Sequence, residues 1–240
     1  MKQYKCLSSS KLPIGANVWD SIFKESGKFF RDPHSKIQLL SKRLKKKKAL
    51  KILDLETTRN SAINEEEIIE IACIKISERF EVLDEFHTLI KPPCQLSYIT
   101  KIKTGINERD LYNEPKINES LISLLEFIKE GIVIAHNAKF DYKVLKQNCK
   151  KHNFILNNTF IDSLSLLKNI FPNEKCSLIS LKDKFNINKD HHRALDDVYA
   201  LKEILFFSNK YCVERFRNSI LDNLDKFKII NPDTQATLDF

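Results

Sequence analysis

Glycine is scarce in this 240-residue sequence, which holds only four, at positions 15, 27, 105 and 131. Phosphate-binding loops of the Walker and dinucleotide types need several glycines close together, so both classes are excluded. The six cysteines stand singly without a Cys-x-x-Cys pair, which argues against a zinc ribbon. There is also no secretory signal and no apolar run of about 18 residues. We therefore expect a cytoplasmic protein with reduced thiols and no membrane segment.

Positive charge is concentrated near the N-terminal end. The formal net charge is +8, but residues 1–49 hold 13 Lys/Arg and 3 Asp/Glu, which leaves −2 for the rest. The densest run, SKRLKKKKAL at 41–50, is of a kind that either stays solvated or contacts an anionic polymer such as nucleic acid. If Lys45–Lys48 contact DNA without sequence preference, replacing all four with alanine will flatten the salt dependence of binding.

The chain divides into three parts by composition. Residues 1–48 are predicted to form a basic, mostly helical extension, because apolar residues in NVWDSIFKESGKFF (17–30) have helical spacing. Residues 49–208 hold the strand and helix patterns of one domain. Residues 209–240 are predicted to form one helix and a flexible tail, since Asn231-Pro232 interrupts regular structure.

The central part begins with three strand patterns in succession, LKILDLETT (50–58), EIIEIACIKIS (67–77) and FEVLDEFHTLIK (80–91). Short polar connections between them favour an antiparallel meander. Strands at 132–135 and 159–164 then alternate with helices at 118–130, 140–153, 165–171, 177–185 and 193–210. This order predicts an α/β domain with a mixed central sheet flanked by helices.

Two carboxylates stand at the end of the first predicted strand. Asp54 and Glu56 are two residues apart, so their side chains face the same side. They lie at the carboxyl end, where α/β sheets bind ligands. Like charges this close repel each other unless a cation lies between them, and Mg²⁺ prefers oxygen ligands. The pair is a candidate half of a metal site, although Asp-x-Glu also occurs by chance.

Two further segments carry polar groups at the ends of predicted elements. HNAKFD (136–141) follows a strand and places Asp141 at the start of a helix, where an aspartate can also act as an ordinary cap. HHRALDDVYAL (191–201) supplies His192 and Asp197. On one continuous helix these two would lie about 140° apart. They converge only if His192 lies in the loop before the helix and Asp197 lies one turn inside it.

In this order, the three segments resemble those of the DnaQ-like, DEDDh-type 3′→5′ exonucleases, which have an RNase H-like fold. The resemblance covers about residues 50–208. It includes ETT (56–58), KTGI (103–106), IDSL (161–164) and SLISLKDKFNI (177–187). The chain departs from the family at Arg59, which stands where a glycine usually follows ETT, and this cation could meet a phosphate.

The resemblance implies hydrolysis of phosphodiester bonds with two divalent metal ions, Mg²⁺ or Mn²⁺. By motif, Asp54 would bridge both ions, and Asp141 would support the second. Glu56 and Asp197 would complete the site of the ion that holds the attacking water. His192 would take the proton of that water, because histidine titrates near working pH.

The same resemblance implies a pocket for the terminal nucleotide. Thr57 would meet the 3′ end, and Ile106 would pack on a base. His136 and Phe140 would line the nucleotide. Stacking and backbone contacts suit an enzyme with weak sequence preference, because every base offers an aromatic face.

The last six residues, QATLDF (235–240), resemble the peptide Q-x-x-[LM]-x-F by which bacterial replication and repair proteins bind the sliding clamp. Gln235 would enter a polar cleft, while Leu238 and Phe240 would fill an apolar pocket. This tail favours a proofreading enzyme that acts on DNA 3′ ends, like the epsilon subunit of DNA polymerase III. The sliding clamp and the polymerase alpha subunit would be its partners, the latter through residues 209–234.

Two alternatives stay open at this point. The first is an RNA-directed 3′→5′ exoribonuclease of the RNase T or oligoribonuclease type, against which the clamp-like tail argues. The second is a non-catalytic scaffold that binds nucleic acid or a polymerase. A scaffold would be expected to lose acidic residues, yet all five positions of the motif are present.

Overall fold

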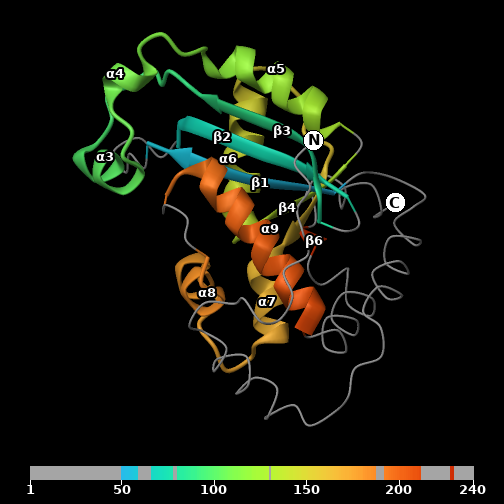
Figure 1. Cartoon of the computed structure of the whole chain (residues 1–240). Coiled ribbons are helices and arrows are strands. Elements are labelled where there is room, and N and C mark those ends of the chain that lie inside the picture. Colours follow the sequence, from blue (N-terminus) through green and yellow to red (C-terminus); the bar gives the residue numbers. More distant parts are fainter. Residues whose placement is uncertain are drawn as a thin grey trace, which may run out of the picture. The chain divides into compact units, whose positions relative to one another are not determined.

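The computed structural model describes residues 50–58, 66–77, 80–129, 131–187, 192–211 and 228–229. These residues build a six-stranded sheet in the order β3-β2-β1-β4-β5-β6, with helices packed around it (Figure 1). The predicted extension 1–48 and the clamp-like tail 235–240 lie outside the described residues. None of the described helices is long and apolar enough to cross a membrane.

The first three strands form the predicted antiparallel meander. They are β1 (Leu50–Thr57), β2 (Ile68–Ile76) and β3 (Val82–Leu89). In the β1–β2 pair, Glu56 lies opposite Glu70. Directly opposed residues of an antiparallel pair point to the same face, so these two carboxylates share one side of the sheet.

Parallel strands extend the sheet on the other side of β1. There, β4 (Ile132–Ala135) pairs with β1, and β5 (Thr159–Asp162) pairs with β4. β6 (Lys228–Ile229) then joins β5 in antiparallel orientation. The sheet is therefore mixed, as predicted. β6 was not predicted, because two residues are too few to show an alternating pattern.

The two faces of the sheet are covered by different helices. Leu53 and Leu55 of β1 point into a core built with α5 (Ile117–Ile128) and α6 (Ala138–Lys151). The opposite face of β1 and β2 is covered by α9 (Ala194–Tyr211). α8 (Leu178–Phe185) packs beside α9, and α7 (Ser163–Ile170) follows directly after β5.

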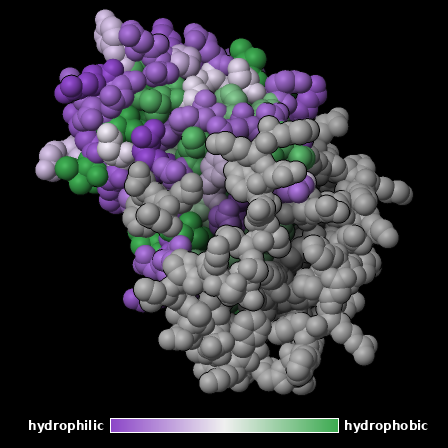
Figure 2. All heavy atoms as spheres, in the orientation of Figure 1, coloured by the Kyte–Doolittle hydropathy of each residue, from purple (hydrophilic) through white to green (hydrophobic). Residues whose placement is uncertain are grey.

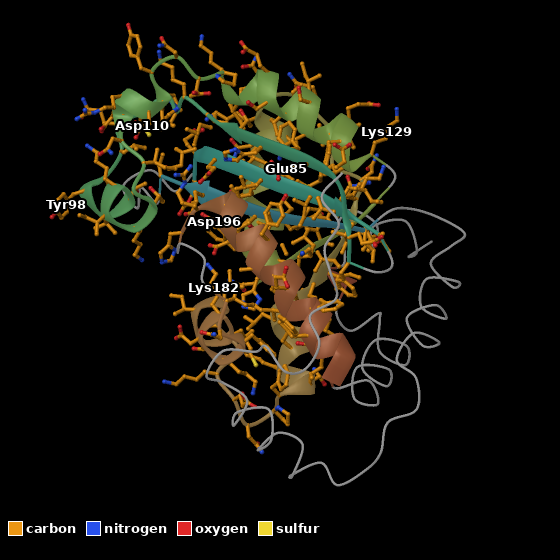
Figure 3. All side chains as sticks on the ribbon, viewed as in Figure 1. Glu85, Tyr98, Asp110, Lys129, Lys182 and Asp196 are labelled. Carbon is orange, nitrogen blue, oxygen red and sulfur yellow. The ribbon has the colours of Figure 1, made fainter. Side chains whose placement is uncertain are left out.

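Two short helices between β3 and α5 were not predicted. They are α3 (Tyr98–Thr104) and α4 (Glu108–Leu111). In α3 the buried residues are Thr100 and Thr104, whereas Tyr98, Ile99 and Ile102 are exposed. The apolar side of this helix thus faces solvent, and Tyr98 projects outward in Figure 3. Figure 2 shows that polar residues cover most of the described surface that is visible from this side.

A buried lysine fixes the end of α5 against β1. The Nζ of Lys51 donates to the carbonyls of Ile128 at 3.3 Å and Lys129 at 3.1 Å. A Cβ at Gly131 would lie 2.1 Å from this Nζ. A side chain at position 131 would therefore have to displace the end of the Lys51 side chain.

Candidate active site

At its carboxyl end β1 extends past its parallel neighbour β4. Ile52 lies opposite Ile134, and β4 ends one residue later at Ala135. β1 continues to Thr57 and so extends beyond its parallel neighbour. The turn after β4 therefore lies beside the part of β1 that carries the acidic residues.

Three carboxylates meet at this place. One oxygen each of Asp54, Glu56 and Asp197 lies within 4.8 Å of the other two. Asp54 is half-buried, while Glu56 and Asp197 are buried. α9 begins at Ala194, so His192 lies in the loop before the helix and Asp197 lies one turn inside it. This is the arrangement that the sequence required for convergence.

Asp141 is the fourth acidic group of the site and lies in the first turn of α6. Its side chain is only 3% exposed. Burial, together with the nearby charge of Glu56, raises the pKa of Asp141 to about 8, although backbone hydrogen bonds oppose the shift. Burial also raises the pKa of Asp54 well above its usual range, with further contributions from Asp141, Asp197 and Glu56. The site thus gathers four carboxyl groups in a poorly solvated place, where burial and mutual repulsion oppose the ionisation of Asp54 and Asp141.

Lys182 of α8 supplies a positive charge to this cluster and was missed by sequence reasoning. Its side chain is 1% exposed, and its Nζ donates to Oδ1 of Asp197. In Figure 3, Lys182 lies on α8 on the side of α9, near the turn that carries the labelled Asp196. Its spacing in the sequence could have indicated that it is buried. Lys182 lies on the same side of α8 as the apolar residues Leu178, Leu181 and Phe185.

Asp162, at the end of β5, holds the turn that leads to Asp141. Its Oδ1 accepts hydrogen bonds from the amides of Asn137 at 3.0 Å and Ala138 at 3.2 Å. Asn137 has φ +66°, a left-handed conformation that asparagine tolerates better than most residues. The IDSL motif drew attention to this segment but did not reveal its role at the start of α6.

The residues predicted to line the nucleotide differ in how much surface they offer. Ile106 is only 2% exposed and lies in a small cluster with Ile69, Leu96 and Leu111. It packs within the protein in this structure, and its contact with a base stays a prediction. Phe140 is partly buried against the main core and keeps part of its ring accessible.

Thr57 and His136 are engaged within the protein. The Oγ1 of Thr57 donates to Glu66 Oε2 at 2.7 Å. The ring nitrogens of His136 lie 3.2 Å from Ser163 Oγ and 2.9 Å from the carbonyl oxygen of Cys176. Burial lowers the pKa of His136, so its ring is neutral at pH 7. Their contacts with a nucleotide stay predictions, and Arg59 lies outside the described residues.

The fold and the site together define a class of protein. A mixed sheet that carries an acidic cluster at the end of its central strand, completed from two helices, is the arrangement of an RNase H-like nuclease core. The exonuclease family model named RNase_T matches residues 52–205. The chain belongs to this exonuclease family, and the family and fold predicted from the sequence are confirmed.

Proteins with a sequence similar to this chain include DNA polymerase III chains. The chain is 38% identical to DNA polymerase III PolC-type from Caldanaerobacter subterraneus subsp. tengcongensis, over 64% of this chain. It spans only about 11% of the length of that relative. It is 29% identical to DNA polymerase III subunit epsilon from Buchnera aphidicola subsp. Acyrthosiphon pisum, over 77% of this chain and 82% of the relative.

Solved structures with the same fold are exonucleases. Exonuclease X in complex with 5′ overhanging duplex DNA is 22% identical, with a TM-score of 0.55, and the match covers 70% of this chain and 99% of that one. The nuclease domain of 3′hExo, a DEDDh family member bound to rAMP, is 18% identical, with a TM-score of 0.59. That match covers 74% of this chain and 94% of the other. These likenesses show the fold.

Proposed function

We propose that this protein is a metal-dependent exonuclease that hydrolyses phosphodiester bonds at DNA 3′ ends. The observation that carries the proposal is the convergence of Asp54, Glu56 and Asp197 within 4.8 Å, with the buried Asp141 close by. These groups come from β1, α6 and α9. Membership of the exonuclease family supports the same reaction class.

The donor set fits divalent cations. Its oxygens are carboxylates, which Mg²⁺ and Mn²⁺ favour, and their mutual repulsion would be relieved by a cation. Asp54, Glu56 and Asp197 would hold one ion, while Asp54 and Asp141 would hold the second. When bound, such ions activate a water and stabilise charge on the phosphate under attack.

The protein's own groups have distinct tasks in this proposal. His192 would accept a proton from the attacking water, because it lies in the loop before the helix that carries Asp197. Phe140 lies in the first turn of α6, directly before Asp141, and is only partly buried, so it would contact the terminal nucleotide. Lys182 donates to Oδ1 of Asp197 and so compensates part of the charge of this carboxylate.

A proofreading role at primer ends is the best fit among DNA exonucleases. It is supported by the likeness to a protein named DNA polymerase III subunit epsilon, which is matched over most of its length. The polymerase alpha subunit and the sliding clamp would be partners, through residues 209–234 and Gln235, Leu238 and Phe240. These contacts rest on the sequence pattern alone.

The test is digestion, in Mg²⁺, of a 3′-mismatched primer–template and of a single-stranded RNA. The wild type is compared with Asp54→Ala, and with Asp196→Ala as a matched control outside the cluster. Loss of DNA 3′ ends by the wild type and by Asp196→Ala, but not by Asp54→Ala, is expected. Trimming of RNA with intact DNA would instead make it an RNA-directed enzyme. No digestion of either would favour a binding scaffold.

A further inference from the structure

A further buried carboxylate lies beside the site but does not join it. Glu70 of β2 is 0% exposed and lies opposite Glu56, on the same face of the sheet. The group of carboxylates that could share a cation contains Glu56 but not Glu70. A buried carboxylate needs partners, and those of Glu70 show what it does.

Both oxygens of Glu70 are occupied by donors from the protein. The Nε and Nη2 of Arg193 lie 3.3 and 3.1 Å from Oε1, and the Nε also lies 3.2 Å from Oε2. The amide of Ala194 donates to Oε2 at 3.1 Å. On the other side, His87 Nε2 lies 2.8 Å from Oε1. We call these four residues, Glu70, His87, Arg193 and Ala194, the Glu70 cluster.

These partners stabilise the negative charge of Glu70. Burial alone would raise the pKa of Glu70, but the hydrogen bonds from His87, Arg193 and Ala194 outweigh it and lower the pKa below its ordinary value. The carboxylate is therefore ionised at pH 7. Because its oxygens are already engaged, Glu70 has little capacity left to bind a cation at the neighbouring acidic site.

Glu70 holds the two residues that directly follow His192 in the chain, Arg193 and Ala194. His192 itself has φ +60°, a left-handed conformation that is unfavourable for a residue other than glycine. Such conformations persist where the surrounding structure holds them. Arg193 and Ala194 are tied to the sheet by Glu70, so the backbone at His192 has a fixed point on its C-terminal side.

We propose that Glu70 is a positioning residue that fixes His192 relative to the acidic site, by holding Arg193 and Ala194. The inference rests on the proposed exonuclease function, in which His192 accepts a proton. Glu70 acts through the backbone of the turn and does not touch the substrate. Its loss should slow the chemical step and leave the binding of metal and DNA intact.

Glu85 of β3 offers a matched control, because it also ties α9 to the sheet. Its Oε2 accepts a hydrogen bond from Tyr199 Oη at 2.6 Å. This contact lies further along α9, at Tyr199, and does not involve the turn at His192. Glu85→Gln removes the charge from this link between sheet and helix, as Glu70→Gln does at the turn, so it separates anchoring of α9 in general from positioning of His192.

The experiment combines Glu70→Gln and Glu85→Gln each with His192→Ala in double-mutant cycles. Glu70→Gln is expected to lower kcat for single-stranded DNA by about 10²-fold, as a small misplacement of a reacting group can do. Its KM and its Mn²⁺ affinity, measured by calorimetry, should stay within about twofold of wild type. In the His192→Ala background, Glu70→Gln should have almost no further effect. Glu85→Gln should be near wild type.

Losses that multiply in the Glu70→Gln/His192→Ala double variant would overturn the inference, as would a parallel loss of Mn²⁺ affinity. If Glu70→Gln fails to fold, Arg193→Gln replaces it, because the Arg193 side chain is 40% exposed and can be changed with less disturbance. It should show the same non-additive loss.

A measurement without turnover keeps this inference separate from the proposed function. Hydrogen exchange of the Ala194 amide should be faster in Glu70→Gln than in wild type, and unchanged in Glu85→Gln. If the wild type digests no nucleic acid, the exonuclease proposal fails, but exchange still decides whether Glu70 holds the turn. Equal exchange in Glu70→Gln and wild type would overturn the positioning role.

Discussion

Lys182 and Asp197 form a buried ion pair between α8 and α9, at the point where the acidic site is assembled. The ammonium group compensates part of the charge of Asp197. A buried pair of this kind leaves a costly unpaired charge if one partner is removed. Lys182 therefore stabilises the site most when no metal ion is bound.

Replacing Lys182 with methionine should destabilise the metal-free protein. We expect a loss of about 3 kcal/mol, which corresponds to a drop in Tm of roughly 6–12 °C for a domain of this size. Mn²⁺ should recover most of this loss, since a cation can then compensate Asp197. The measurement is thermal melting in EDTA and in Mn²⁺. Lys184→Met, which removes a more exposed pair with Glu174 from the same helix, is the control. An equal drop in both conditions would contradict the prediction.

Replacing His192 with glutamine should separate chemistry from metal binding. Loss of a general base typically lowers kcat by about 10²–10⁴-fold. The carboxylates are untouched, so Mn²⁺ affinity measured by calorimetry should be unchanged. Asp197→Asn, in contrast, should lower both kcat and Mn²⁺ affinity. If His192→Gln weakened Mn²⁺ binding as much as Asp197→Asn does, the proposed division of roles would be wrong.

The raised pKa of Asp141 makes stability depend on pH. Its pKa is about 8 in the folded protein, compared with 3.8 for an aspartate in an unfolded chain. Between these values the folded state binds more protons than the unfolded state, so stability falls as pH rises from about 4 to 8. Tm in EDTA should decrease across this window, and Asp141→Asn should flatten the decrease. Mg²⁺ should stabilise the protein increasingly as pH rises. A metal-free Tm that rises from pH 5 to 8 would refute this.

Gly131→Ala should be destabilising because a Cβ at this position would lie 2.1 Å from Lys51 Nζ. Lys51 would have to leave the carbonyls of Ile128 and Lys129 or displace the chain. We expect a loss of about 1–3 kcal/mol in urea unfolding. Lys51→Met should reduce the penalty when both changes are combined. Equal penalties with and without the lysine would show that another contact excludes the methyl group.

The C-terminal peptide should bind a bacterial sliding clamp independently of catalysis. Replacing Gln235, Leu238 and Phe240 with alanine should abolish binding, measured by surface plasmon resonance against the clamp. Digestion of a short oligonucleotide should be unchanged. Thr237→Ala, at a position where the motif accepts any residue, should bind like wild type. Binding that survives the triple change would remove the basis for a clamp partner.

The sequence predicted the sheet well because its strands follow simple rules. The three antiparallel strands have apolar, β-branched runs with short connections, and the structure pairs them as expected. His192 lies outside α9, which is the condition that helix geometry sets for His192 and Asp197 to point at one site. Local pattern was enough in these cases.

The parts that were missed depend on contacts between distant residues. α3 was missed because its apolar side chains, such as Ile99 and Ile102, face solvent while Thr100 is buried. Lys182 and Glu70 were missed because a charged residue in an apolar pattern looks like an exposed one until its partner is known. Those partners are 15 and 123 residues away in the chain.

Asp162 receives hydrogen bonds from the starts of two different helices. Besides Asn137 and Ala138 before α6, the amides of Leu164 and Ser165 in α7 donate to the same carboxylate, at 3.2 and 3.3 Å. When this side chain releases one helix start, it loses much of what holds it for the other. The first turns of α6 and α7 should therefore fray together, as one cooperative unit, and not as two independent helix ends.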